Sequence, residues 1–230
     1  MTNVELLRSR NVDVCLCIDK TRSMERVISG LKSFALNLHK TLMTAAEQRG
    51  MSIAQFRIRL ILFGDYISDS EPIVATRFLT MPEEYLELDK TIGSIVPDGG
   101  GDDPEDGLEA LAYAIRSDWV KNGLRKRHII AMFTDAPAHE LGYGKRAATY
   151  PKCGMPEDFG QLSAMWGDKT YPGEMDNSSK RLLLFAPNKS YWHTISNFWD
   201  NVVIIPTDEF TNLSETEFHH KVDTIFRMLL

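Results

Sequence analysis

Residues 12–23 read VDVCLCIDKTRS, and this stretch decides the fold. The run from Val12 to Ile18 is short and β-rich with apolar residues on both faces, which is typical of a strand covered by helices on each side. Polar residues follow at once, and from Met24 apolar residues recur every three or four positions, as on one face of a helix. The stretch predicts a buried strand, a polar turn and a helix, which Gly50 ends.

The alternation of strand and helix continues along the chain without a linker or a repeat. The run Ile73 to Leu79 follows the strand 56–63 too closely for a parallel crossover, which needs about a dozen residues, so these two strands should pair antiparallel. Further strands are expected at 128–133, 182–185 and 202–205, and further helices at 82–95, from Pro104 onward, and at 157–166, 191–199 and 214–229. We predict one doubly wound, Rossmann-like α/β domain over residues 1–230, with a mostly parallel central sheet, one antiparallel edge strand and helices on both faces.

Composition narrows the class of protein. The 230 residues are 43% hydrophobic and 25% charged, which is ordinary for a globular domain. Lys and Arg number 26 against 32 Asp and Glu, and the resulting charge of −6 argues against a nucleic-acid partner. No run approaches the roughly 20 apolar residues that a membrane helix needs. An odd number of cysteines, three, favours a reducing compartment. We therefore expect a cytoplasmic protein with no membrane contact.

Five oxygen-bearing side chains fall where the predicted fold would bring them to one edge of the sheet. Three follow the first strand, one follows the strand 128–133, and one precedes the helix that Pro104 is expected to open. Carboxylate and hydroxyl ligands without His or Cys suit a hard divalent ion, Mg²⁺ or alternatively Mn²⁺ or Ca²⁺. The candidate metal ligands are Asp19, Thr21, Ser23, Asp102 and Asp135.

The loop GGGDDPED, residues 99–106, precedes the helix expected from Pro104. Asp102 or Asp103 can cap that helix, and acidic residues in its first turn complement the helix dipole. We interpret Asp103, Glu105 and Asp106 as capping or solvated charges rather than as ligands.

The triplet Asp19, Thr21 and Ser23, together with Asp102 and Asp135, resembles the metal-ion-dependent adhesion site of von Willebrand factor A domains. In that family the first loop reads Asp-x-Ser-x-Ser, a second loop supplies Thr and a third supplies Asp. These groups hold a metal whose free position accepts a carboxylate from a partner protein. The resemblance covers nearly the whole chain and implies a metal-dependent protein interaction module rather than an enzyme.

The loop GGGDDPED is similar to the loop of bacterial intracellular members of that family and of those attached to alpha-kinases, where Asp replaces the usual Thr. Counting back from Gly107 and Leu108 places Asp102 there rather than Asp103. The resemblance also implies a place in a bacterial kinase and phosphatase stress-signalling cluster.

The third carboxylate changes the charge of the predicted site. Three carboxylates carry −3, so a divalent cation leaves −1, whereas the usual site with two carboxylates would be neutral. Metal should bind more tightly, and an acidic partner should be attracted less unless a neighbouring cation compensates. Lys20 and Arg22 are the candidates, and Arg22 could either screen the site or meet an acidic partner directly.

Two alternatives remain beside the interaction module. In one, a metal-dependent phosphohydrolase uses Asp19 as nucleophile or metal ligand and His139 as acid or base. A hydrogen-bonded histidine that orders the loop after it is the simpler interpretation of His139. In the other, the chain is a metal-free scaffold. The irregular segment 139–180 should lie over the metal-site edge as a rim and select the partner.

Overall fold

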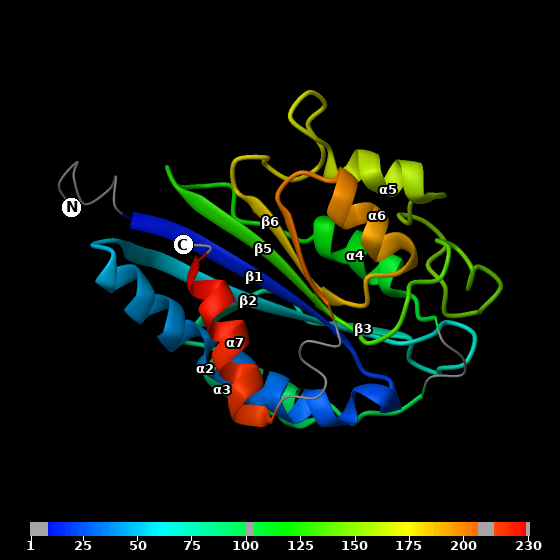
Figure 1. Cartoon of the computed structure of the whole chain (residues 1–230), viewed down its shortest axis with the longest axis horizontal. Coiled ribbons are helices and arrows are strands. Elements are labelled where there is room, and N and C mark those ends of the chain that lie inside the picture. The colour runs from blue at the N-terminus through cyan, green and yellow to red at the C-terminus, as the bar shows by residue number, and fades with distance from the viewer. Residues whose placement is uncertain (1–8, 100–103, 207–213, 229–230) are drawn as a thin grey trace.

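The computed structural model describes residues 9–99, 104–206 and 214–228 (Figure 1). Within these residues a seven-stranded sheet has the order β3-β2-β1-β5-β6-β7, and β4 also pairs with β2. Pairs among β1, β2, β5, β6 and β7 are all parallel. This confirms the predicted mixed α/β fold with a mostly parallel sheet. The strands are β1 (Ser9–Asp19), β2 (Ser52–Phe63), β3 (Ile73–Ala75), β4 (Leu79–Met81), β5 (Lys126–Phe133), β6 (Lys180–Ala186) and β7 (Val202–Pro206).

The order of winding reverses at β1. The chain passes from β1 to β2 on one side and later returns to β5 on the other, so β1 lies between them. Because the three strands are parallel, their carboxyl ends meet at one edge of the sheet, where open α/β folds place their ligands. Asp19 ends β1 at this edge, opposite Phe63, and Ile18 lies opposite Phe133.

The antiparallel edge differs from the single strand predicted over 73–79. Two short strands, β3 and β4, pair with β2 instead. Ile61 faces Ala75 and Ile58 faces Leu79, so three steps along β2 correspond to four along the partner. The extra residue breaks the ladder at a bulge, where the Thr76 hydroxyl accepts a hydrogen bond from the Leu60 amide at 3.0 Å.

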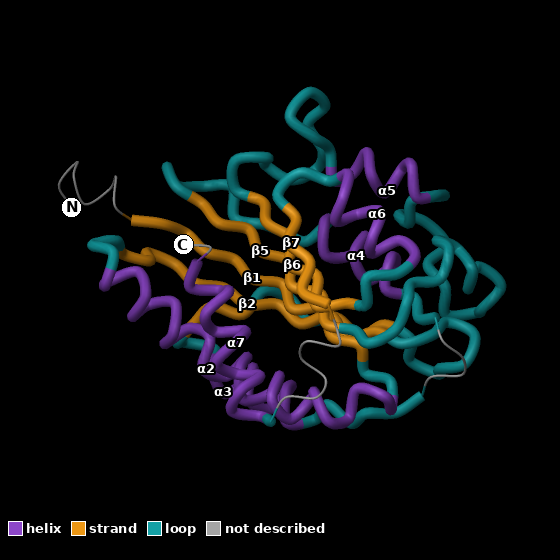
Figure 2. The backbone as a smooth tube through the Cα atoms, viewed as in Figure 1, coloured by secondary structure: helices purple, strands orange, loops and turns teal. Residues whose placement is uncertain are grey.

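Helices cover both faces of the sheet (Figure 2). Helices α2, α3 and α7 cover one face of the sheet and its hydrophobic core. Helices α4, α5 and α6 cover the other face and a second core. Both cores contain alternate residues of β1, which explains why that strand is apolar throughout. The helices are α2 (Glu25–Gln48), α3 (Tyr85–Gly93), α4 (Gly107–Ile115), α5 (Phe159–Trp166), α6 (Ser190–Phe198) and α7 (Glu215–Met228), and a short 3-10 helix, η1 (Arg22–Met24), precedes α2.

Helix α4 begins at Gly107, so the prediction of a helix from Pro104 is wrong. The backbone of Glu105 instead forms a parallel bridge with the loop after β5: its amide donates to Pro137 O at 3.0 Å, and its carbonyl accepts from the His139 amide at 2.9 Å. This tertiary pairing holds the residue extended and delays the helix. Asp106 is the N-cap, but its side chain makes no capping bond.

The segment 139–180 divides into two parts. Its first turns lie at the carboxyl edge, where the ring of Tyr150 packs 4.8 Å from that of Tyr66. The second part contains α5 and returns to the amino ends of the strands, because β6 runs parallel to β5 and must start at that end. There Glu174 pairs with Arg116 at 2.9 Å. Only the first part can therefore act as a rim beside the predicted metal site.

Among the described residues, no helix combines the length and the apolar character that crossing a membrane requires.

Candidate metal site at the carboxyl edge of the sheet

Asp19 is the centre of the site. Its side chain is fully buried at the end of β1, and both carboxylate oxygens accept hydrogen bonds. Oδ1 accepts from the Thr21 amide at 2.9 Å and from the Thr21 hydroxyl at 2.6 Å. Oδ2 accepts from the Thr134 hydroxyl at 2.6 Å, across the end of β5. These bonds fix the orientation of the carboxylate.

The chain of hydrogen bonds continues outward to β5. The hydroxyls of Thr21 and Ser23 lie 3.2 Å apart, and the Ser23 hydroxyl donates to Asp135 Oδ1 at 2.8 Å. Four of the five predicted ligands thus form one connected group. Asp19 and Thr21 are buried, whereas Ser23 is exposed to solvent. The fifth, Asp102, lies outside the described residues.

Burial sets the electrostatics of this group. The pKa of Asp19 is raised to about 6, mainly by burial and also by the negative charge of Asp135, although hydrogen bonds from Thr134 and Thr21 act to lower it. A buried carboxylate with a second carboxylate nearby is stabilised by a cation that both can contact.

The donors fit a hard cation better than a soft one. Carboxylates and hydroxyls supply only oxygen, the ligand type of Mg²⁺, Mn²⁺ and Ca²⁺. Among the residues that the structure describes, no three His, Cys, Asp or Glu side chains are grouped so that they could hold a metal ion. The hydroxyls of Thr21 and Ser23 would therefore have to serve as ligands beside Asp19 and Asp135.

Arg22 lies in the same loop and points to the surface. Its guanidinium is 3.6 Å from Asp98, and both side chains are 77% exposed. An exposed pair of this kind contributes little to stability, so an anionic group from outside can compete for Arg22 at small cost.

A second acidic group lies beside the predicted ligands, and sequence reasoning missed it. Glu105 and Asp106 are buried, so their interpretation as capping or solvated charges is wrong; Asp103 lies outside the described residues. Asp106 Oδ2 accepts a hydrogen bond from the Tyr66 amide at 2.6 Å. Burial, followed by the charges of Asp19 and Asp65, raises the pKa of Glu105 to about 9.

His139 belongs to this second group. It is 5% exposed, its Nε2 lies 3.4 Å from Asp65 Oδ2, and its ring stacks on Tyr143 with centroids 3.9 Å apart. Among the described residues Nε2 has no hydrogen-bond partner, so the hydrogen-bonded histidine expected from the sequence stays a prediction. The sequence contained one signal for the group: Gly64-Asp65 directly follows β2, Asp19 ends β1, and neighbouring parallel strands end at the same edge.

Comparison with known proteins identifies the fold. No protein-family description matches the chain, and no curated protein sequence matches it. Among solved structures, two of the pilus adhesin SpaC from Lactobacillus rhamnosus GG are similar, one of them in an open conformation, with TM-scores of 0.55 and 0.52. Sequence identity is 10% in both, over 96% of this chain but only 31% and 30% of SpaC. The chain thus spans under a third of the length of SpaC, and the similarity is one of fold.

Proposed function

We propose that this chain is a metal-dependent protein interaction module of the von Willebrand factor A type. Asp19, Thr21, Ser23 and Asp135 would hold Mg²⁺ directly or through water, with Asp102 as a further ligand. The observation that supports this most strongly is the connected group of hydroxyl and carboxylate oxygens at the ends of β1 and β5, built around a buried Asp19.

The exposure of these residues suggests how the site would work. Asp19 lies deepest, with both oxygens accepting hydrogen bonds from Thr21 and Thr134, and would hold the cation through water. Ser23 is exposed and Asp135 half-buried, so a partner would approach from their side. The bound metal would supply an electrophile for a carboxylate of the partner protein. Arg22, exposed in the same loop, would add a positive charge beside that carboxylate.

The phosphohydrolase alternative has less support. A nucleophilic Asp19 would need a free oxygen and access to substrate, yet this side chain is fully buried and both oxygens accept hydrogen bonds. His139 is buried and paired with Asp65, away from solvent. The bacterial and cytoplasmic setting, and a place beside a kinase and a phosphatase, are part of the proposal and rest on the family resemblance alone.

The test measures binding of Mg²⁺ by calorimetry and thermal stability with Mg²⁺ or EDTA. Mg²⁺ should stabilise the wild type, because a ligand that binds only the folded state raises its stability. Asp135→Asn should weaken Mg²⁺ binding at least about tenfold, a loss usual for changes around a metal. Asp118→Asn, an exposed aspartate in the link between α4 and β5, is the matched control and should bind Mg²⁺ as the wild type does.

Two results would overturn the proposal. One is a wild-type protein whose stability is the same in EDTA and in Mg²⁺, which would favour a metal-free scaffold. The other is turnover of p-nitrophenyl phosphate that requires Mg²⁺ and disappears in Asp19→Asn, which would favour the hydrolase.

A further inference from the structure

Four arginines gather at the amino edge of the sheet, opposite the predicted metal site. Arg10 lies in β1, Arg127 in β5 and Arg181 in β6, while the carbonyl of Arg125 accepts a hydrogen bond from the Asn11 amide at 3.0 Å, just before β5. These strands are neighbours, so residues far apart in sequence meet here.

The strand register puts three of these arginines on one face of the sheet. Val12 lies beside Arg127, and Ile129 lies beside Arg181. Side chains two residues apart in a strand share a face, so Arg10 follows the face of Val12 and Arg127 follows that of Ile129. Like charges that face each other in neighbouring strands destabilise a sheet. The hydrophobic pattern of these strands does not explain why arginines occupy these positions.

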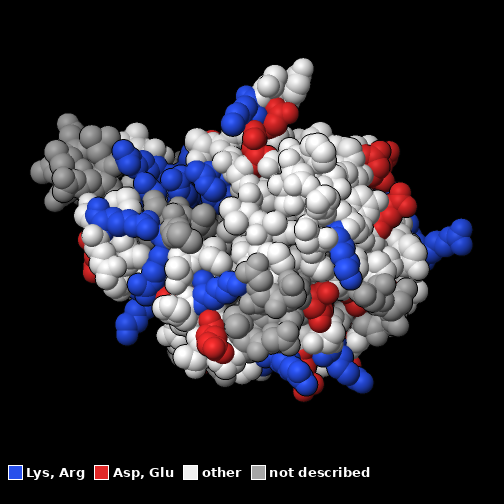
Figure 3. Space-filling view, viewed as in Figure 1, with Lys and Arg blue, Asp and Glu red and all other residues white. Residues whose placement is uncertain are grey.

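The positive charges of the guanidinium groups repel one another. Burial, followed by the charges of Arg181, Arg10 and Arg125, lowers the pKa of Arg127 to about 10. Burial and the charges of Arg125, Arg49 and Arg181 lower the pKa of Arg10. Figure 3 shows Lys and Arg side chains gathered at the upper left of the molecule, next to the amino end of β1. This density of positive charge stands out in a chain whose formal charge is −6.

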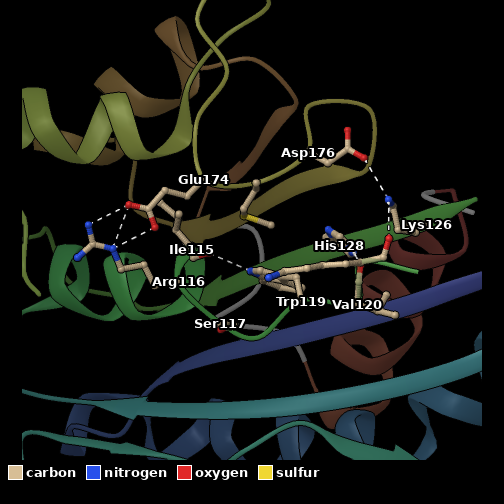
Figure 4. A pocket seen from close by; sticks show the side chains of 11 residues that line it. Ile115, Arg116, Ser117, Trp119, Val120, Lys126, His128, Glu174 and Asp176 are labelled. Carbon is tan, nitrogen blue, oxygen red and sulfur yellow. Dashed lines mark hydrogen bonds and ion pairs between the residues drawn. The ribbon is translucent and has the colours of Figure 1, made fainter. Parts of the chain in front are cut away.

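Three of the four arginines line a hollow, and Arg181 lies outside its lining. A pocket of about 270 Å³ is lined by Arg10, Leu124, Arg125, Lys126, Arg127, Asp176, Ser178 and Ser179. Lys126 and Asp176, 3.6 Å apart, also line a neighbouring pocket of about 480 Å³. In this larger pocket Arg116 pairs with Glu174, and Lys126 pairs with Asp176 (Figure 4). Among the described residues that line the smaller pocket, four are Arg or Lys and one, Asp176, is acidic.

We propose that this arginine pocket binds the phosphate group of a small phosphorylated ligand. Guanidinium groups match phosphate oxygens with paired hydrogen bonds, and a phosphate carries enough charge to offset several arginines at once. The hydroxyls of Ser178 and Ser179 donate to Asp176 at 2.8 and 3.1 Å, so they hold the acidic residue of the lining and leave the arginines to contact the phosphate. A single carboxylate would neutralise only one of the arginines. A nucleic acid would require a basic stripe along the surface, whereas this charge is confined to one concave end.

Calorimetry and thermal shift with inorganic phosphate and with pyrophosphate test the proposal. All samples contain EDTA, so that no metal occupies the predicted metal site. NaCl keeps the ionic strength constant, so that differences between ligands do not come from screening of charges. Pyrophosphate should raise the melting temperature above that in chloride, and inorganic phosphate should do so more weakly. Arg127→Gln should weaken pyrophosphate binding about tenfold, as expected for the loss of a charged hydrogen bond. Arg125→Gln changes an exposed side chain, so this variant should fold and show a similar loss.

Arg146→Gln, an exposed arginine at the opposite edge, is the matched control and should bind pyrophosphate as the wild type does. Without any phosphate, Arg125→Gln should be as stable as the wild type, because this side chain is exposed; an arginine with a purely structural role would destabilise the fold when lost. Equal stabilisation by chloride, citrate and pyrophosphate would overturn the proposal. So would unchanged binding in both variants, or binding of single-stranded DNA without binding of pyrophosphate.

Discussion

Glu109 offers a direct test of how burial controls charge next to the candidate site. This residue lies in α4 and is fully buried. Its Oε1 accepts hydrogen bonds from the Gly142 amide at 2.7 Å and from the Tyr150 hydroxyl at 3.2 Å, so it fastens the first part of the segment 139–180. Burial, followed by the charge of Asp106, raises the pKa of Glu109 from 4.5 to about 7, despite the hydrogen bond from Gly142.

The size of the effect follows from that difference in pKa. Each pKa unit corresponds to about 1.4 kcal/mol, so the charged carboxylate costs the fold about 3 kcal/mol. Between about pH 4.5 and about pH 7, Glu109 is protonated in the folded state and charged in the unfolded state. The wild type should therefore lose this stability as pH rises from about 4.5 through about 7. Glu109→Gln keeps the Oε1 acceptor and resembles the protonated form, so the part of the loss that Glu109 causes should be absent in this variant.

Urea unfolding at pH 5 and at pH 8.5, in EDTA, measures the difference. Glu109→Gln should exceed the wild type by about 1 kcal/mol at pH 5 and by about 3 kcal/mol at pH 8.5. Glu47→Gln, an exposed residue of α2, should show no gain at either pH. A variant less stable than the wild type at pH 8.5, or a difference that is equal at both pH values, would refute the reasoning.

Three further outcomes are expected. Asp102→Thr should retain Mg²⁺ binding in calorimetry but change the affinity for an acidic partner, and if both were unchanged the assignment of Asp102 would be wrong. Asp13→Ala should cost about 3–5 kcal/mol in urea unfolding, because Asp13 is fully buried and pairs with Arg57 at 2.6 Å; a cost below about 1 kcal/mol would contradict this. Trp166→Ala should also cost about 3–5 kcal/mol, since this fully buried ring fills the core beneath α5 and lies under the Lys180 ammonium at 4.6 Å; unfolding at the wild-type urea midpoint would argue against it.

Local patterns in the sequence predicted most of the elements. Apolar runs and helical periodicity located each parallel strand and its following helix, and Gly50 does end α2, with a positive φ of 64°. They also placed Asp19, Thr21, Ser23 and Asp135 correctly at one edge, because the direction of parallel strands determines where the side chains after them lie.

Local patterns failed where pairing across the fold competed with them. Pro104 and the acidic residues after it are typical of a helix start, yet the bridge between Glu105 and Ala138 holds this stretch extended. The run 73–79 looked like one strand, and only its pairing with β2 shows the bulge that divides it.

The amino-acid sequence by itself determined which segments are buried and in what order strands and helices follow, since burial periodicity depends on neighbours along the chain. Only the tertiary structure decided which charges are buried together. Glu105 lies near Asp65, and Arg10 near Arg127, because separate strands end or begin side by side. The energy of a charge depends on its distance from other charges and from water, and folding alone sets those distances.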